Sequence, residues 1–392
     1  PNRAVIDPSA ITENTRAMGT LLEEQTALMA VVKADGYGHG MLTAARAAIE
    51  GGATWLGVAH PASALALARA DLDVEIRPSE NAHLRADLDA QILTWLFEPH
   101  TAKIVLPEVL ASGVDVSVGS PEMLALVSEA ARAAERRARV HLKIDTGMGR
   151  NGVLPWQIRE MGAAMREDDF VQVAGAWTHL TTADDPADPA TDQQVELFDS
   201  AVAALADEVG PIPLQHIANS AATLTRPDLH RDLVRVGIAL YGCPPVTTDV
   251  PLRPAMTLTS RLALVKEVGE GHSIGYGRIR STERRTRLGL VPIGYADGLH
   301  RTGSDQVDLV VRTESGDHRA AQVGRISMDQ IVVDLGPDSD ARAGDQVFLF
   351  GDAGGDPNGP AAATAEDWAR AAGTISYEVL TSVSGRVTRE VR

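Results

Sequence analysis

Cysteine, aromatic residues and long apolar runs are all scarce in this sequence. The chain of 392 residues has one cysteine, Cys243, which excludes an intramolecular disulfide framework and a multi-cysteine metal site. We expect Cys243 to be a small packed residue. No apolar run is long enough to span a bilayer, and the start, Pro1–Asp7, lacks the apolar core of a secretory signal. The sequence therefore predicts a cytoplasmic protein with no membrane partner and no bound metal.

Basic residues are also too few for a nucleic-acid partner. The 36 Lys and Arg residues face 53 Asp and Glu residues, which gives a formal charge of −17. Nucleic acids and anionic membranes both demand basic surface, so the charge argues against either as a partner. It does not exclude a small substrate, whose binding depends on local charge. The length and the apolar fraction of 44% suit a large α/β domain with a second domain.

Short apolar segments alternate with longer alanine-rich stretches from Leu28 to about Tyr241. This alternation is typical of repeated β–α units with a parallel sheet. Eight candidate strands lie near Leu28–Lys33, Trp55–Ala59, Gln91–Leu96, Val114–Val118, Val140–Asp145, Val173–His179, Pro213–Ala218 and Val234–Leu240. Eight units fit a closed barrel, and no GxGxxG sequence opens the first helix. The sequence thus predicts an α/β fold with an N-terminal (β/α)8 TIM-type barrel over residues 1–245.

The alternation of strands and helices ends at Pro244-Pro245. Short strands separated by turns rich in Gly, Asp and Arg are expected at Leu262–Val268, Leu288–Pro292, Val307–Arg312 and Gln346–Phe350. This pattern predicts a C-terminal, mainly β domain over residues 246–392. The charged stretch Asp71–Asp89 is interpreted as a surface insertion without catalytic meaning.

Lys33 ends the first candidate strand and is followed at once by a glycine-rich turn. The β-branched Val31 and Val32 indicate a buried strand, and an ammonium withdrawn from water is costly unless it is paired, neutralised or used covalently. Lys33 is therefore a candidate Schiff-base former, with a lysine that reaches solvent as the alternative. The glycines to Gly40 let the backbone bend around a ligand, and Tyr37 offers a hydroxyl.

Polar residues recur where the candidate strands end, and the active sites of (β/α)8 enzymes gather at those ends. These residues are Lys33, Lys143, Asp145, His179, Asn219, Ser220, Arg235 and Gly237. The pattern indicates an enzyme. Within the fifth candidate strand, alternation puts His141, Lys143 and Asp145 on one face. An ion pair between Lys143 and Asp145 is the structural alternative to a catalytic role.

Segments throughout the chain resemble motifs of the alanine racemases, which use pyridoxal phosphate, and they follow in family order. They are Val31–Gly40, Lys143–Arg150, Thr178–His179, His216–Ser220, Val234–Ile238, Gly275–Gly277, Ser327–Asp329 and Thr374–Glu378. The resemblance implies interconversion of L- and D-alanine through a pyridoxal 5'-phosphate aldimine, with D-alanine supplied for peptidoglycan. Lys33 and Tyr276 would act as the two bases on opposite faces of the substrate.

The resemblance also implies further site residues. The residues expected to bind the cofactor are Lys33, Tyr37, His179, Asn219, Ser220, Arg235, Gly237, Ile238 and Tyr377. Arg235 would leave the pyridine nitrogen unprotonated, because an arginine does not readily give up a proton. Arg150, Met328 and Asp329 would bind the substrate, and the family lysine that matches Lys143 is often carbamylated.

A homodimer with shared active sites follows from the same resemblance. Tyr276 and the pair Met328-Asp329 lie in the predicted β domain and, by family analogy, reach the site of the other subunit. Each monomer would then hold only half of a site.

Three rival functions keep the barrel. Amino-acid decarboxylases of this class use a cysteine from the β domain, whereas Cys243 lies at the end of the barrel. A racemase for serine or a basic amino acid is the second rival, and a pyridoxal-phosphate carrier without turnover is the third. Carriers resemble the barrel alone. A purely structural dimer lacks support, because no matched catalytic position is replaced.

Overall fold

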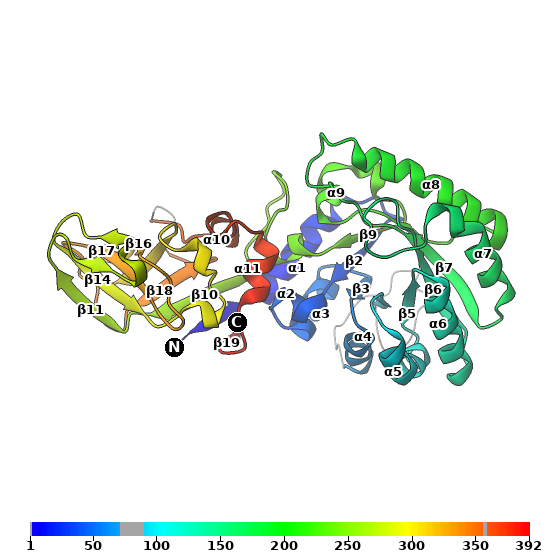
Figure 1. The fold of residues 1–392 in the computed structure, drawn as a ribbon, viewed down its shortest axis with the longest axis horizontal. Coiled ribbons are helices and arrows are strands. Elements are labelled where there is room, and N and C mark those ends of the chain that lie inside the picture. The colour runs from blue at the N-terminus through cyan, green and yellow to red at the C-terminus, as the bar shows by residue number, and fades with distance from the viewer. Residues whose placement is uncertain (1, 71–89, 356–358) are drawn as a thin grey trace. The chain divides into compact units, whose positions relative to one another are not determined.

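The computed structural model describes residues 2–70, 90–355 and 359–392 (Figure 1). The predicted insertion Asp71–Asp89 lies outside the described residues. The chain forms two compact units, of which one comprises Ile11–Gly36 and Met41–Leu252. The other comprises Pro1–Ala10, Tyr37–Gly40 and Arg253–Arg392.

The first unit is a parallel barrel. Its eight strands follow the order β8-β7-β6-β5-β4-β3-β2-β9, so each strand from β2 to β7 pairs with the next along the chain. The strands are β2 (Ala27–Val31), β3 (Trp55–Val58), β4 (Gln91–Thr94), β5 (Asp115–Val118), β6 (Ala138–Lys143), β7 (Val171–Trp177), β8 (Gln215–His216) and β9 (Leu233–Val236). All eight predicted strands are confirmed, with bounds that shift by a few residues.

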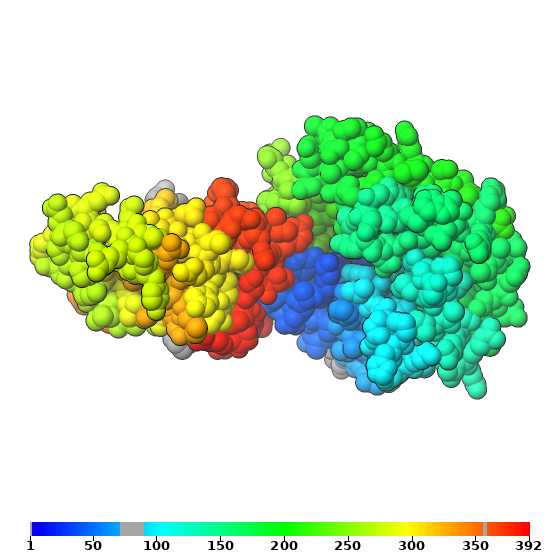
Figure 2. All heavy atoms as spheres, viewed as in Figure 1, coloured from blue at the N-terminus to red at the C-terminus, as the bar shows by residue number. Residues whose placement is uncertain are grey.

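Helices surround the barrel (Figure 1). They are α1 (Pro8–Gly19), α3 (Met41–Glu50), α4 (Pro61–Arg69), α5 (Pro99–Ala111), α6 (Pro121–Ala133), α7 (Ile158–Glu167), α8 (Ala190–Val209) and α9 (Ser220–Thr225). Proline occupies the first position of α4, α5 and α6, where its fixed φ suits a helix and its missing N–H is not needed. The space-filling view shows α5 to α8, cyan to green, as the outer surface of this unit (Figure 2).

The barrel is nearly closed between β8 and β9. The two strands share no continuous ladder among the described residues, but the Arg235 N–H donates to the Ala218 carbonyl at 2.9 Å. On its other side β9 pairs with β2 in parallel, with Arg235 opposite Met29. This seam therefore brings the end of the last strand beside the first.

The interior of the barrel is filled by side chains. Met29, Trp55, Leu93 and Leu233 form one buried cluster. Inward-pointing residues of a small barrel pack in layers and leave no pore, so the site lies beyond this layer, at the carboxyl ends of the strands.

The second unit is built on a sheet of nine strands in the order β11-β14-β17-β16-β15-β18-β10-β1-β19. Its strands are β1 (Arg3–Ile6), β10 (Met256–Arg261), β11 (Leu264–Val268), β14 (Thr286–Val291), β15 (Asp308–Thr313), β16 (Gly316–Val323), β17 (Ile331–Gly336), β18 (Gln346–Phe350) and β19 (Thr388–Val391). A hairpin of β12 (Ser273–Ile274) and β13 (Arg280–Ser281) and the helices α10 (Ala365–Ala372) and α11 (Ser376–Ser382) complete the unit. The four strands expected after Pro245 are all confirmed, as β11, β14, β15 and β18.

The N-terminus differs from the predicted division at residue 245. Strand β1 pairs antiparallel with β10 and parallel with β19, so Pro1–Ala10 joins the second unit. Strand pairing, which alternation along one strand does not reveal, decides this placement. None of the helices in the described ranges is both long and apolar enough to cross a membrane.

Candidate active site

Lys33 lies two residues beyond the end of β2, at the carboxyl edge of the barrel. The strand ends at Val31, and the Lys33 side chain is exposed. Surrounding protein atoms, and then the Arg150 guanidinium, lower the pKa of Lys33 below its ordinary value. The exposure agrees with the alternative in which the lysine reaches solvent, whereas the lowered pKa suits a nucleophile, because more of the amine is neutral.

A left-handed turn follows Lys33. Ala34, Asp35, Gly36 and Tyr37 have φ values of 53°, 53°, 60° and 52°. Left-handed backbone costs roughly 1–2 kcal/mol for a residue other than glycine, and such conformations cluster at functional sites. The left-handed conformation therefore includes residues other than the glycines from which the turn was predicted. Asp35 compensates in part, because its carboxylate accepts from the Met41 N–H at 2.8 Å, where α3 begins.

Lys143, at the end of β6, contacts an aromatic ring. Its Nζ lies 4.4 Å from the centroid of the Trp177 ring, and no ion pair with Asp145 exists among the residues described. Asp145 instead accepts from the N–H groups of Gly147 and Gly149, at 3.0 and 3.1 Å. Burial, followed by Arg150 and Arg235, lowers the pKa of Lys143 to about 8. No Lys143–Asp145 ion pair therefore forms among the described residues, and the charge of Asp145 only partly opposes the lowering of the Lys143 pKa.

Arg235, on β9, is buried, and five backbone or imidazole groups contact its two Nη atoms. Nη1 donates to the His216 carbonyl at 2.8 Å and lies 3.3 Å from His216 Nδ1. Nη2 donates to the carbonyls of Thr178 and Ile217, at 2.8 and 3.1 Å, and lies 3.3 Å from His179 Nδ1. In the described part of the chain none of these bonds uses Nε. Burial lowers the pKa of Arg235 to about 9, so the guanidinium is still a cation at neutral pH.

His179 follows β7 and stays neutral. Burial, and then the charge of Arg235, hold the pKa of His179 well below its ordinary value. Since Arg235 has only donors, the Nδ1 atom of His179 is the acceptor in their contact and the proton is on Nε2. The imidazole thus offers the guanidinium a neutral acceptor.

Asn219 and Ser220 form the start of α9, after β8. The Asn219 side chain accepts from the Ala222 N–H at 3.0 Å and caps the helix. The Gly237 N–H donates to Ser220 Oγ at 2.9 Å, which leaves the hydroxyl proton of Ser220 able to donate elsewhere. Ile238 is buried beside them at the start of a short 3-10 helix. The structure thus brings together four of the residues predicted to bind the cofactor, Asn219, Ser220, Gly237 and Ile238.

Tyr37 and Tyr377 meet in the second unit. Their ring centroids are 6.1 Å apart, and Tyr37 is buried while Tyr377 is half-buried. Burial, and then Tyr377, raise the pKa of Tyr37, so this phenol keeps its proton and can donate it in a hydrogen bond.

Tyr276 and Met328 are exposed, with 69% and 53% of their surfaces accessible within this single chain. Large exposed side chains of this kind are typical of contact sites for another molecule. The Asp329 carboxylate accepts from Arg386 Nη2 at 2.7 Å, so its own chain already neutralises it. Arg150 is exposed in the barrel unit and forms no ion pair with any described residue.

Two family models match the chain: the alanine racemase N-terminal domain over residues 6–245 and the C-terminal domain over residues 255–391. A curated alanine racemase from Streptomyces coelicolor is 45% identical, covering 99% of this chain and 95% of its own. The solved alanine racemase from Streptomyces lavendulae is 42% identical with a TM-score of 0.87, covering 100% and 97% of the two chains. A third, from Bacillus anthracis with bound L-Ala-P, is 29% identical with a TM-score of 0.82, covering 100% and 95%.

The chain belongs to the alanine racemase family. It is therefore an enzyme of an isomerase family that depends on pyridoxal phosphate. Cys243 is buried in the barrel unit of this family member, at 4% exposure, so it does not supply the β-domain cysteine that a decarboxylase needs.

Sequence reasoning missed several groups that position the family site. Gln194, near the start of α8, donates to Thr146 Oγ1 and the His179 carbonyl, at 3.0 and 3.1 Å, and accepts from the Thr181 N–H at 2.8 Å. Its place within a regular helix gives no local signal. Trp177 was not predicted either, although its ring contacts both Lys143 and Arg235. The Arg235 Cζ atom lies 4.8 Å from the ring centroid.

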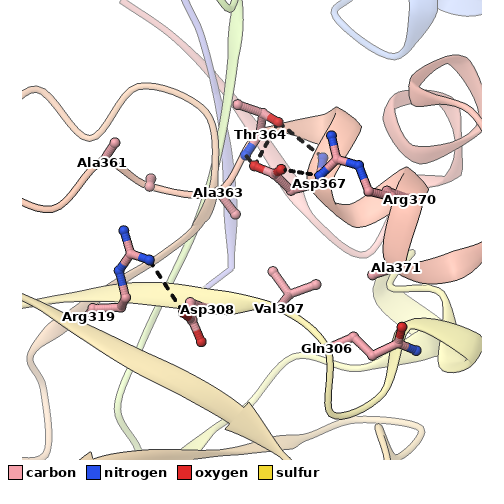
Figure 3. Close-up of a pocket in the computed structure, with 11 residues that line it drawn as sticks. Gln306, Val307, Asp308, Arg319, Ala361, Ala363, Thr364, Asp367, Arg370 and Ala371 are labelled. Carbon is pink, nitrogen blue, oxygen red and sulfur yellow. Dashed lines mark hydrogen bonds and ion pairs between the residues drawn. The ribbon is translucent and has the colours of Figure 1, made fainter.

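A hollow in the second unit is not part of this site (Figure 3). Its charged side chains are already paired: Arg319 with Asp308 at 3.5 Å, and Arg370 with Asp367 at 2.8 Å. Within the described ranges, no group of three or more His, Cys, Asp or Glu residues could hold a metal ion.

Proposed function

We propose that this protein interconverts L- and D-alanine with pyridoxal phosphate as its cofactor, and that Lys33 and Tyr276 act as the two bases. The observation that carries the proposal is the arrangement around Arg235. Both Nη atoms of this buried cation are bonded to protein groups, whereas the described residues leave Nε without a partner. An acceptor such as a pyridine nitrogen fits that single N–H.

The donor set after β8 and β9 fits a phosphate. The first N–H groups of a helix have no partner within it, and α9 begins at Ser220, whose hydroxyl proton is available. Asn219 fixes this helix start, the Gly237 N–H orients the Ser220 hydroxyl, and Ile238 would supply a backbone N–H. The family resemblance implies that Tyr37 and Tyr377 also bind the cofactor. These residues, with Lys33, His179 and Arg235, would hold the cofactor.

When bound, pyridoxal phosphate withdraws electrons from the substrate Cα and weakens its C–H bond. Lys33, with its lowered pKa, would hold the cofactor covalently and then accept or return a proton on one face of Cα. The Tyr276 hydroxyl would serve the opposite face. Arg235 keeps its proton and would leave the pyridine nitrogen unprotonated. This state favours proton transfer at Cα over transamination.

The exposed Tyr276 and Met328 support a homodimer with shared sites, in which each would reach the site of a second copy. Arg150, Met328 and Asp329 would then bind the substrate carboxylate, Arg150 through its guanidinium. The bound L-Ala-P of the Bacillus anthracis relative supports alanine as the substrate. Use of the D-alanine in peptidoglycan, in the cytoplasm, belongs to the same proposal.

The test is incubation of the purified protein and pyridoxal phosphate with L-alanine, L-serine and L-lysine, followed by chiral chromatography. We expect D-alanine from the wild type and none from Lys33→Ala or Tyr276→Phe. Lys103→Ala, on the exposed face of α5, is the matched control and should retain activity. Another preferred substrate, or a bound cofactor with no turnover, would overturn the proposal.

A further inference from the structure

A chain of buried side chains runs across the barrel and ends at Arg235. Asp115 Oδ2 lies 3.0 Å from His141 Nε2, and His141 Nδ1 lies 2.9 Å from His216 Nε2. His216 Nδ1 lies 3.3 Å from Arg235 Nη1. The side chains of Asp115, His141 and His216 are fully buried, and Arg235 is 6% exposed. Four strands, β5, β6, β8 and β9, thus contribute one continuous line of polar atoms.

The two ends of this chain fix the direction of every hydrogen bond in it. A guanidinium has only donors, so His216 Nδ1 must accept from Arg235, and the His216 proton is on Nε2. That N–H donates to His141 Nδ1, which leaves the His141 proton on Nε2. Asp115, ionised and limited to accepting, receives it. An added proton on either imidazole would turn two donors toward each other.

The surroundings hold this arrangement. Asp115 Oδ1 accepts from Gln91 Nε2 at 2.7 Å and from Arg139 Nε at 2.9 Å, so the carboxylate is stabilised as an anion. Burial, and then Arg235, keep the pKa of His216 well below its ordinary value. The His141 ring occupies the space beside Gly175, where a Cβ would lie 2.7 Å from Nδ1.

We propose that Asp115 and His141 are positioning residues that fix the tautomer of His216 and thereby hold Arg235 with its Nε–H free for the cofactor. The inference rests on the proposed function for its catalytic meaning. The proton positions themselves do not depend on that function. Both residues act on Arg235 only through His216.

The direct test is the tautomer of His216 in the holoprotein, read by nitrogen NMR of protein labelled with 15N-histidine. His216→Gln assigns the signals. We expect His216 and His141 each to carry the proton on Nε2. A proton on His216 Nδ1 would overturn the inference, even if the enzyme racemises alanine.

The second test uses Asp115→Asn and His141→Phe, with His230→Gln as a buried-histidine control outside the chain. We expect the two variants to lose the single His216 tautomer, to release pyridoxal phosphate faster on dialysis, and to lower kcat by about ten- to a hundredfold with little change in KM. Asp115→Asn keeps the shape of the side chain, so it still tests the inference if His141→Phe does not fold. Unchanged tautomer, cofactor release and kcat in a folded variant would reject the inference. An inactive wild type with the expected tautomers would reject only the proposed function.

Discussion

The Lys143 ammonium lies against the Trp177 ring, with 4.4 Å between Nζ and the ring centroid. This contact stabilises a cation by about 0.5–2 kcal/mol. Burial and the charges of Arg150 and Arg235 oppose it and lower the pKa of Lys143 to about 8. The Lys143 amine is therefore about half neutral near pH 8. The neighbouring Arg150 and Arg235 would stabilise a negative charge on this side chain better than a positive one.

We therefore predict that Lys143 reacts with carbon dioxide to form a carbamate. Only the neutral amine reacts, so the reaction should increase as pH rises toward and above about 8 and decrease below it. Carbon NMR of protein incubated with 13C-bicarbonate should show a carbamate signal at pH 8.5 that weakens at pH 6.5. The signal should vanish in Lys143→Met and persist in Lys103→Ala. A signal that survives Lys143→Met would contradict the assignment.

Mixed dimers test the shared site. One inactive variant, Lys33→Ala, and another, Tyr276→Phe, are refolded or co-expressed together in equal amounts. If each site joins Lys33 of one subunit with Tyr276 of the other, half of the sites in each mixed dimer contain both residues. We expect about one quarter of wild-type activity from a random mixture. Two sites that each lie within one chain would give no recovery.

Asn219→Ala should weaken both the fold and the cofactor site. The substitution removes the N-cap of α9, which costs about 1 kcal/mol in the free energy of unfolding. Because α9 begins the phosphate-binding region, the rate of pyridoxal-phosphate release should also rise. Thr364→Ala, which removes the N-cap of α10 in the other unit, is the matched control. It should lower stability by a similar amount without changing the release rate.

Gly175→Ala should destabilise the protein through His141. The new Cβ would lie 2.7 Å from His141 Nδ1 and 2.8 Å from the Leu214 carbonyl, so the ring must move. Overpacking of this kind costs typically about 1–3 kcal/mol, measured as the free energy of unfolding in urea. Gly19→Ala, at the end of α1, meets nothing within 4 Å and should change stability little. Equal values for the two variants would show that the His141 ring accommodates the methyl group.

The sequence by itself determined the strands and which residues end them. Apolar runs and helical spacing are local properties, so the eight barrel strands and the four strands sought beyond Pro245 were all found. The positions of Lys33, Lys143, Asn219 and Arg235 at strand ends followed from the same reasoning, because parallel strands present their carboxyl ends at one edge.

Only the tertiary structure decided which polar groups meet. It placed β1 in the sheet of the second unit, since strand pairing depends on partners far along the chain. It turned Asp145 toward Gly147 and Gly149 and Lys143 toward Trp177, and it aligned Asp115, His141 and His216 behind Arg235. Hydrogen-bond direction depends on every donor and acceptor within about 3 Å, and no spacing along the sequence specifies that set.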